Sequence, residues 1–277
     1  MVTPLRFGTL SDERNQGWFI LDYGRAGTGK TSLVKTLKGK VLYVGFEQNG
    51  YASIRNYDGD VSILKAWDEE EVLNLIRNLY QEMSVSASDS IFKDFDHIVY
   101  DSISTMSQKL LEHFSKKYQE ESKARSGSDA KYTDMRAYGD VLKLMRKFFM
   151  LNRGLTRKLG TDGKMVNVIC IAQQVSKEGD FNKNMPSVDG NKLLSELLHT
   201  FDCIWHSEID MDGNYIIRTK AKENDNYEAK DRSGNLDEIE PANAQEILDK
   251  MNDVTPSPSL DQASNQESKK VSKVIDK

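Results

Sequence analysis

The chain has 277 residues, of which 38% are hydrophobic and 29% are charged, so it can form a soluble domain with one sizeable core. Its formal net charge of −5 argues against indiscriminate binding to polyanions. The first residues contain no apolar run like a signal peptide, and no stretch approaches the ~18 apolar residues of a membrane span. We therefore expect a cytoplasmic protein without a membrane partner.

Along the chain, strand-like and helix-like segments alternate, which predicts an α/β fold whose mostly parallel sheet is covered by helices on both faces. Two apolar segments around a short MDG turn predict an antiparallel hairpin near the end of the domain. The expected strands are 18–23, 40–46, 97–102 and 166–174, the hairpin is 203–222, and the expected helices are 30–37, 69–83, 102–118, 135–159 and 191–201. The Ser-, Pro- and Gln-rich segment 253–277 is expected to be a disordered tail after a domain of residues 1–252.

The segment GRAGTGKT matches the P-loop pattern G-x-x-x-x-G-K-[ST] between an apolar strand and a helix. Its glycines let the backbone curl so that N–H groups point at phosphate oxygens. Lys30 is expected to reach the β- and γ-phosphates, and the Thr31 hydroxyl to ligate Mg²⁺. The sequence therefore predicts a site for ATP with Mg²⁺. Its residues are Gly24, Arg25, Ala26, Gly27, Thr28, Gly29, Lys30, Thr31 and Ser32.

Polar residues follow three other apolar strands, where ligands of parallel α/β sheets bind. Asp101 ends the strand HIVYD and is the expected second metal residue, but Ser102 follows it, so the catalytic base must come from elsewhere. Glu47, directly after KVLYVGF, is the candidate base. Gln173 and Gln174 close the strand VICIA, and the amide of one of them can sense the γ-phosphate.

The positive charge is concentrated in the middle of the chain. Residues 105–160 carry 13 Lys and Arg against 6 Asp and Glu, which suits a phosphate backbone or, alternatively, solvated helix faces. Two polar stretches, 119–134 and 175–192, are predicted to be long loops, the first of them mobile.

Taken in order, the P-loop, Glu47, Asp101 with its following serine, and the strand-end glutamines resemble a RecA-type ATPase core over about 17–240. The closest resemblance is to the short phage-encoded RecA-like ATPases of single-strand annealing and recombination. This resemblance implies that Glu47 activates water, that a strand-end glutamine couples ATP to DNA, and that the two long loops bind single-stranded DNA. The expected DNA contacts are Arg125, Lys131 and Lys177 with phosphates, and Tyr132 and Phe181 with bases.

The segment EAKDRSG is similar to the Lys-x-Arg stretch that RecA-type hexameric helicases insert into a neighbouring nucleotide site. By this resemblance Lys230 and Arg232 act in trans, which requires a homo-oligomer, either a ring or a filament. Such cations offset charge that develops at the γ-phosphate.

The sequence thus favours a DNA-stimulated ATPase that binds single-stranded DNA and promotes annealing, recombination or replication of DNA, in the host cytoplasm if a phage encodes it. An alternative is an ATP-gated switch or loader that recruits replication proteins, such as a single-strand-binding protein, through the tail. A P-loop kinase for small molecules is a further alternative, although no arginine-rich lid is evident.

Overall fold

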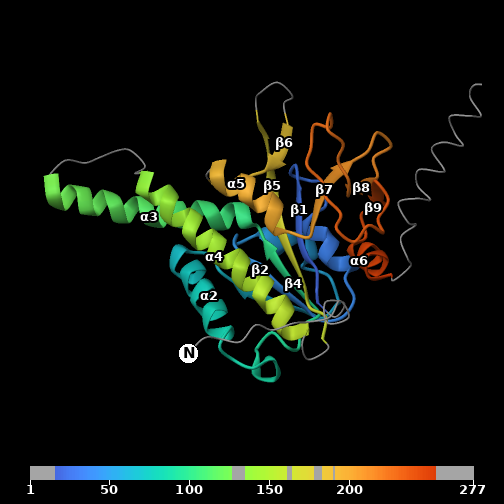
Figure 1. The fold of residues 1–277 in the computed structure, drawn as a ribbon, viewed down its shortest axis with the longest axis horizontal. Coiled ribbons are helices and arrows are strands. Elements are labelled where there is room, and N and C mark those ends of the chain that lie inside the picture. Colours follow the sequence, from blue (N-terminus) through green and yellow to red (C-terminus); the bar gives the residue numbers. More distant parts are fainter. Residues whose placement is uncertain (1–15, 127–134, 161–163, 178–182, 190, 254–277) are drawn as a thin grey trace, which may run out of the picture.

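A mixed β-sheet forms the centre of the chain in a computed structural model, which describes residues 16–126, 135–160, 164–177, 183–189 and 191–253. Within these residues the strand order is β3-β2-β4-β5-β1-β7-β8-β9, and β6 pairs with the far end of β5 (Figure 1). The strands are β1 (Phe19–Gly24), β2 (Val41–Gly45), β3 (Val61–Lys65), β4 (His97–Asp101), β5 (Asn167–Lys177), β6 (Lys183–Pro186), β7 (Cys203–Ile209), β8 (Tyr215–Arg218) and β9 (Ile239–Pro241).

The six strands from β3 to β7 in this order are parallel, whereas β8, β9 and β6 join antiparallel. The predicted α/β class with an antiparallel hairpin extension is therefore confirmed. The helices are η1 (Thr31–Thr36), η2 (Gly50–Ile54), α2 (Glu69–Glu82), η3 (Ala87–Asp89), α3 (Ile103–Ser126), α4 (Met135–Gly160), α5 (Asn191–Thr200) and α6 (Ala244–Asn252). None of the helices in the described ranges is long and apolar enough to cross a membrane.

Each face of the sheet has its own hydrophobic core, because side chains alternate along each strand. Phe19, Leu21 and Tyr23 of β1 pack into the layer formed by α2, α3 and α4. Ile20, between them, packs into the opposite layer with η1 and α6. Figure 1 shows α2 and α4 across one face of the sheet, with α3 extending beyond it.

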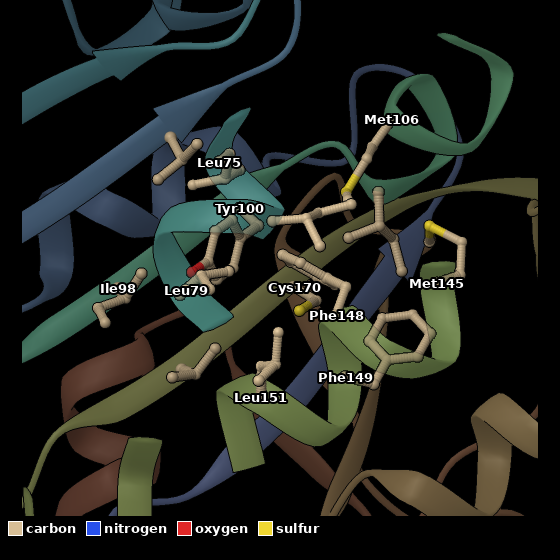
Figure 2. Packing of buried hydrophobic residues seen from close by; sticks show 14 of the residues in the cluster. Leu75, Leu79, Ile98, Tyr100, Met106, Met145, Phe148, Phe149, Leu151 and Cys170 are labelled. Carbon is tan, nitrogen blue, oxygen red and sulfur yellow. The ribbon is translucent and has the colours of Figure 1, made fainter. Parts of the chain in front are cut away.

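Helix α4 fills most of the first layer because apolar residues recur on one of its faces every three or four positions. Phe148 is fully buried, and its ring meets Tyr100 of β4 edge-on at 4.8 Å between centroids. Figure 2 shows these two rings in the packed layer with Met145 and Cys170. Cys170 and the second cysteine, Cys203, are both buried and free.

Several elements differ from those expected. The helix after the P-loop is a 3₁₀ helix of six residues, Thr31–Thr36. It stays short because Leu37 is extended and Gly39, at φ 84°, turns the chain before β2 begins at Val41. Strands β3, β6 and β9 were not predicted, because they are short and partly exposed edge segments.

The two predicted loops are shorter than expected. Residues 119–126 continue α3, since Gln, Glu, Lys and Ala favour a helix despite their polarity. Residues 175–177 and 183–186 form the strands of a β5–β6 hairpin. The predicted tail beyond residue 253 lies outside the described residues, and α6 ends at Asn252.

We expect Phe148→Ala to lower the free energy of unfolding by about 3–5 kcal/mol, because it leaves a cavity between α4 and β4. Urea denaturation followed by circular dichroism measures this change. Met150→Ala is the control on the same helix, because Met150 is 72% exposed and should change stability by less than about 0.5 kcal/mol. Equal effects of the two substitutions would contradict the assigned faces of α4.

Candidate nucleotide site

A cleft of about 830 Å³ lies at the carboxyl ends of β1, β4 and β5. The register places Gly24 beside Gln173 and Asp101 beside Ile171, so residues from three strands meet at this edge. Residues lining the cleft include Ala26, Gly27, Gly29, Lys30, Thr31, Ser32, Glu47, Gly50, Asp101, Ser102, Gln173, Gln174 and Tyr215. The structure therefore brings together the predicted P-loop, metal residue, base and glutamines.

The P-loop adopts the tight curl that its glycines allow. Gly27 and Gly29 both have φ of 85°, a conformation that side-chain-bearing residues rarely adopt. At Gly24 a Cβ atom would lie 2.2 Å from the carbonyl oxygen of Ser207, so β7 leaves no room there for a side chain. Thr28 is buried and donates to the Arg25 carbonyl at 2.9 Å, which closes the loop on itself.

The Lys30 ammonium lies over this loop and donates to the carbonyls of Gly24 and Arg25 at 2.8 and 2.7 Å. Burial lowers the pKa of Lys30, against the attraction of Asp22 and Asp101. Phosphate oxygens are stronger acceptors than these neutral carbonyls, so the amine suits a bound triphosphate. The curled loop and its lysine fit the predicted nucleotide.

Asp101 and Thr31 form the predicted metal pair. The Thr31 hydroxyl donates to Asp101 Oδ2 at 2.5 Å, and the Tyr43 hydroxyl donates to the same oxygen at 3.0 Å. Burial raises the pKa of Asp101, while both of these hydrogen bonds oppose that rise. A hydroxyl and a carboxylate are the hard oxygen ligands that Mg²⁺ prefers, so the residues fit this ion. The described residues contain no cluster of three His, Cys, Asp or Glu that could hold another metal.

Glu47 is exposed and lines the cleft two residues beyond β2. Its carboxylate accepts a hydrogen bond from the Thr105 hydroxyl at 2.5 Å, and this hydroxyl also contacts Ser102 at 3.0 Å. The first turn of α3 thereby holds Glu47 beside the end of β4. This position allows the carboxylate to orient a water molecule in the cleft.

Gln173 and Gln174 both line the cleft, but their partners differ. The backbone N–H of Gln173 donates to Ser104 Oγ at 2.9 Å, and its side chain is exposed. The side chain of Gln174 is half-buried, and its Oε1 lies 3.0 Å from His206 Nε2. Among the described contacts, the side chain of Gln174 therefore has a hydrogen bond and that of Gln173 has none.

Lys230 and Arg232 do not line this cleft. Lys230 pairs with Ile204 near the start of β7 and donates to the Leu198 carbonyl at 2.6 Å. Arg232 is exposed and forms an ion pair with Asp202 at 3.4 Å. The described contacts of both residues are with other parts of the chain than the P-loop, so action in trans stays a prediction.

The predicted DNA contacts fall largely on residues beyond those described. Lys131, Tyr132 and Phe181 lie outside the described ranges. Arg125 is near the end of α3, and Lys177 is the last residue of β5, but the description does not extend to their side chains. Their roles stay predictions.

The sequence did not predict four residues that lie at this site: Asp22, Thr105, His206 and Tyr215. Asp22 is fully buried on β1 under the loop, and its Oδ1 accepts from Ser207 at 2.6 Å. Tyr215 of β8 places its ring against Gly29 at the mouth of the cleft. An acid inside the apolar run WFILDY was a visible signal for Asp22. Nonlocal strand pairing places His206 and Tyr215, and Thr105 reaches the site through the first turn of α3.

This fold and site define a P-loop nucleoside triphosphatase, with the phosphate loop after β1 and Asp101, the predicted metal residue, at the end of β4. A protein-family model described as an AAA domain matches residues 16–233. The chain therefore belongs to the AAA domain family and is an ATPase of the P-loop class. A search of curated proteins finds no match.

Asp22→Asn should stabilise the protein above pH 7, because burial raises the pKa of Asp22 from 3.8 to about 7. With a raised folded-state pKa, stability falls as pH rises from about 4 to 7, since the buried carboxyl must lose its proton. At pH 8 the free energy of unfolding of Asp22→Asn should exceed that of the wild type by up to about 4 kcal/mol. Urea denaturation of both proteins from pH 5 to 8 measures it.

The control is Asp58→Asn, which removes a carboxylate from an exposed position. The free energy of unfolding of this control should change with pH as it does in the wild type. An Asp22→Asn protein with an unchanged slope between pH 5 and 7 would contradict a buried, protonated Asp22.

Proposed function

We propose that the chain is a RecA-like, DNA-stimulated ATPase that binds single-stranded DNA, hydrolyses ATP at subunit interfaces, and promotes annealing, recombination or replication of DNA. The observation that supports this most is the path of β5, whose Gln173 and Gln174 line the nucleotide cleft before the strand continues into the β5–β6 hairpin. A change at the nucleotide can therefore reach this hairpin along one strand.

For hydrolysis, Lys30 holds the phosphates and Glu47 orients water. Thr31 and Asp101 would hold Mg²⁺, which offsets the negative charge of the triphosphate. Thr105 keeps the Glu47 carboxylate within the cleft through its hydrogen bond. Buried Asp22 adds a negative charge near Lys30 whenever it is ionised, which favours the charged amine.

For DNA binding, two elements lead away from the cleft. Helix α3 begins at Ile103, directly after the metal residue, and runs antiparallel to α4 along the basic middle segment (Figure 1). Part of this charge is already compensated, since Lys116 pairs with Glu69 and Lys143 with Asp140. Exposed cations among the described side chains of the two helices are Lys116, Lys117, Lys123, Arg136, Lys143, Lys147 and Arg157.

The proposed trans action of Lys230 and Arg232 needs a homo-oligomer, a ring or a filament. The contact of Arg232 with Asp202 is long, at 3.4 Å, and half of its side chain is exposed, so this guanidinium can exchange partners at low energetic cost. The tail after residue 253 would recruit a single-strand-binding protein.

Glu47→Gln should lower the rate of ATP hydrolysis by about 100-fold or more, because an amide cannot accept the proton of the attacking water. Binding of ATP should persist, since Glu47 makes none of the P-loop contacts. Steady-state phosphate release, with and without single-stranded DNA, measures the rate. Lys30→Ala serves as the blank and should lose nucleotide binding.

The matched control is Glu70→Gln on the exposed side of α2, which should hydrolyse ATP at the wild-type rate. Unchanged hydrolysis in Glu47→Gln would remove Glu47 from the base role. A wild-type rate that single-stranded DNA does not raise would contradict the DNA-stimulated function while leaving the ATPase class intact.

Replacing Arg125, Lys131 and Lys177 together by alanine should lower the affinity for single-stranded DNA and make this affinity less sensitive to salt. Loss of three phosphate contacts makes the negative slope of log K against log salt shallower by about 2. Fluorescence anisotropy with a labelled oligonucleotide at several salt concentrations measures both quantities. The control triple, Lys38, Lys93 and Lys222 to alanine, removes equal charge from exposed positions outside the proposed surface. An equal loss in both triples would contradict the assigned loops.

A further inference from the structure

His206 lies on β7 next to Tyr23 and is 4% exposed, which is unusual for an ionisable side chain beside a polar cleft. Its ring stacks on Tyr227 at 5.1 Å with 10° between the planes, and it contacts Tyr23 at 4.9 Å. Two aromatic rings therefore hold the imidazole in one orientation, and its Nε2 faces Gln174 Oε1 at 3.0 Å.

The surroundings keep this histidine neutral. Burial, together with the charges of Arg218 and Lys30, lowers the pKa of His206 from 6.5 to about 4. The nearest carboxylate, Glu208, lies 3.7 Å from Nδ1 and is engaged by Arg218 at 2.6 Å. Nδ1 has no hydrogen-bond partner among the described residues, so we place the single ring proton on Nε2, the nitrogen that has one.

A protonated Nε2 can only donate, so the Gln174 group that it meets must be the carbonyl oxygen. The side-chain amide has one oxygen and one NH₂ group. With the oxygen engaged by His206, the NH₂ is the group that remains to act in the cleft that Gln174 lines. The NH₂ group can donate to a phosphate oxygen, whereas an oxygen in its place would repel one. Gln173 has no such side-chain contact among the described residues.

We propose that His206 is a positioning residue that makes Gln174, and not Gln173, the donor to the γ-phosphate by fixing the orientation of its amide. This inference rests on the proposed sensing of ATP by a strand-end glutamine. It names the glutamine that senses the nucleotide, and it says which end of its side-chain amide faces the nucleotide. It also links β7, on the far side of β1, to the occupancy of the cleft.

Binding affinities for ADP and for a non-hydrolysable ATP analogue, measured by calorimetry without DNA, test this proposal. Only the ATP analogue carries the γ-phosphate, so Gln174→Ala should lower the affinity for the analogue by roughly 10-fold and leave ADP binding unchanged. Gln173→Ala should lower the analogue affinity less than Gln174→Ala does. Gln81→Ala, at an exposed position on α2, is the matched control and should change neither affinity. A loss in Gln173→Ala and none in Gln174→Ala would overturn the assignment.

Three substitutions at His206 separate its hydrogen bond from its packing. His206→Phe keeps the stacked ring and loses the donor, so it should reproduce the loss seen in Gln174→Ala. His206→Gln places an amide N–H near the position of Nε2 and should retain most of the analogue affinity. The side chain in His206→Asn is too short to reach Gln174, so this variant should lose analogue affinity as Gln174→Ala does. Unchanged ADP affinity shows in each case that the site is folded.

Combining His206→Phe with Gln174→Ala should give no further loss of analogue affinity, because both changes remove one interaction. Additive losses would overturn the positioning role. Gln174→Glu tests the amide polarity without altering β7, since it keeps an acceptor for His206 and presents a second oxygen to the cleft. It should bind the analogue at least as poorly as Gln174→Ala, and a wild-type affinity would overturn the proposed orientation.

Discussion

The parallel ladder of β4, β5 and β1 is the constraint on which the site depends. Its register brings Gly24, Asp101 and Gln173 to one edge of the sheet within two residues of each other. A shift of one residue would exchange the side chains of the two hydrophobic cores, so burial on both faces fixes the register strongly. The position of the P-loop relative to its metal residue is therefore set by core packing.

Burial at this edge sets the electrostatics of the site. Asp22 and Asp101 are buried and Lys30 is half-buried, and desolvation is the largest influence on the pKa of each. Such groups are costly to bury unless they are paired. Hydroxyls of Ser207, Thr31 and Tyr43 supply hydrogen bonds to the two carboxylates, while carbonyls of the P-loop hold the lysine. The triphosphate would replace these resting partners of Lys30.

The first turn of α3 joins the cleft to the β5–β6 hairpin. Ser104 accepts from the Gln173 N–H and donates to the Ser187 carbonyl, and Ser107 donates to Asp189 at 2.9 Å. One residue away, Thr105 holds Glu47. Glu47 and the hairpin therefore contact one short helical segment, which offers a physical route for the coupling proposed between ATP and DNA. On the other side of β1, the contact of His206 with Gln174 adds a second connection.

The sequence by itself determined the P-loop, the strands that carry Glu47, Asp101 and the two glutamines, and the α/β class, because these depend on local patterns of apolar residues and glycine. It also placed α2 and α4 to within one or two residues. It could not distinguish Gln173 from Gln174, identify Asp22 or His206 as parts of the site, or find the β5–β6 hairpin. Only the tertiary structure showed that the side chain of Gln174 meets His206, that Asp22 is buried on β1 and that β5 and β6 form a hairpin. Strand pairing between residues far apart in the chain determines which side chains meet and which are desolvated.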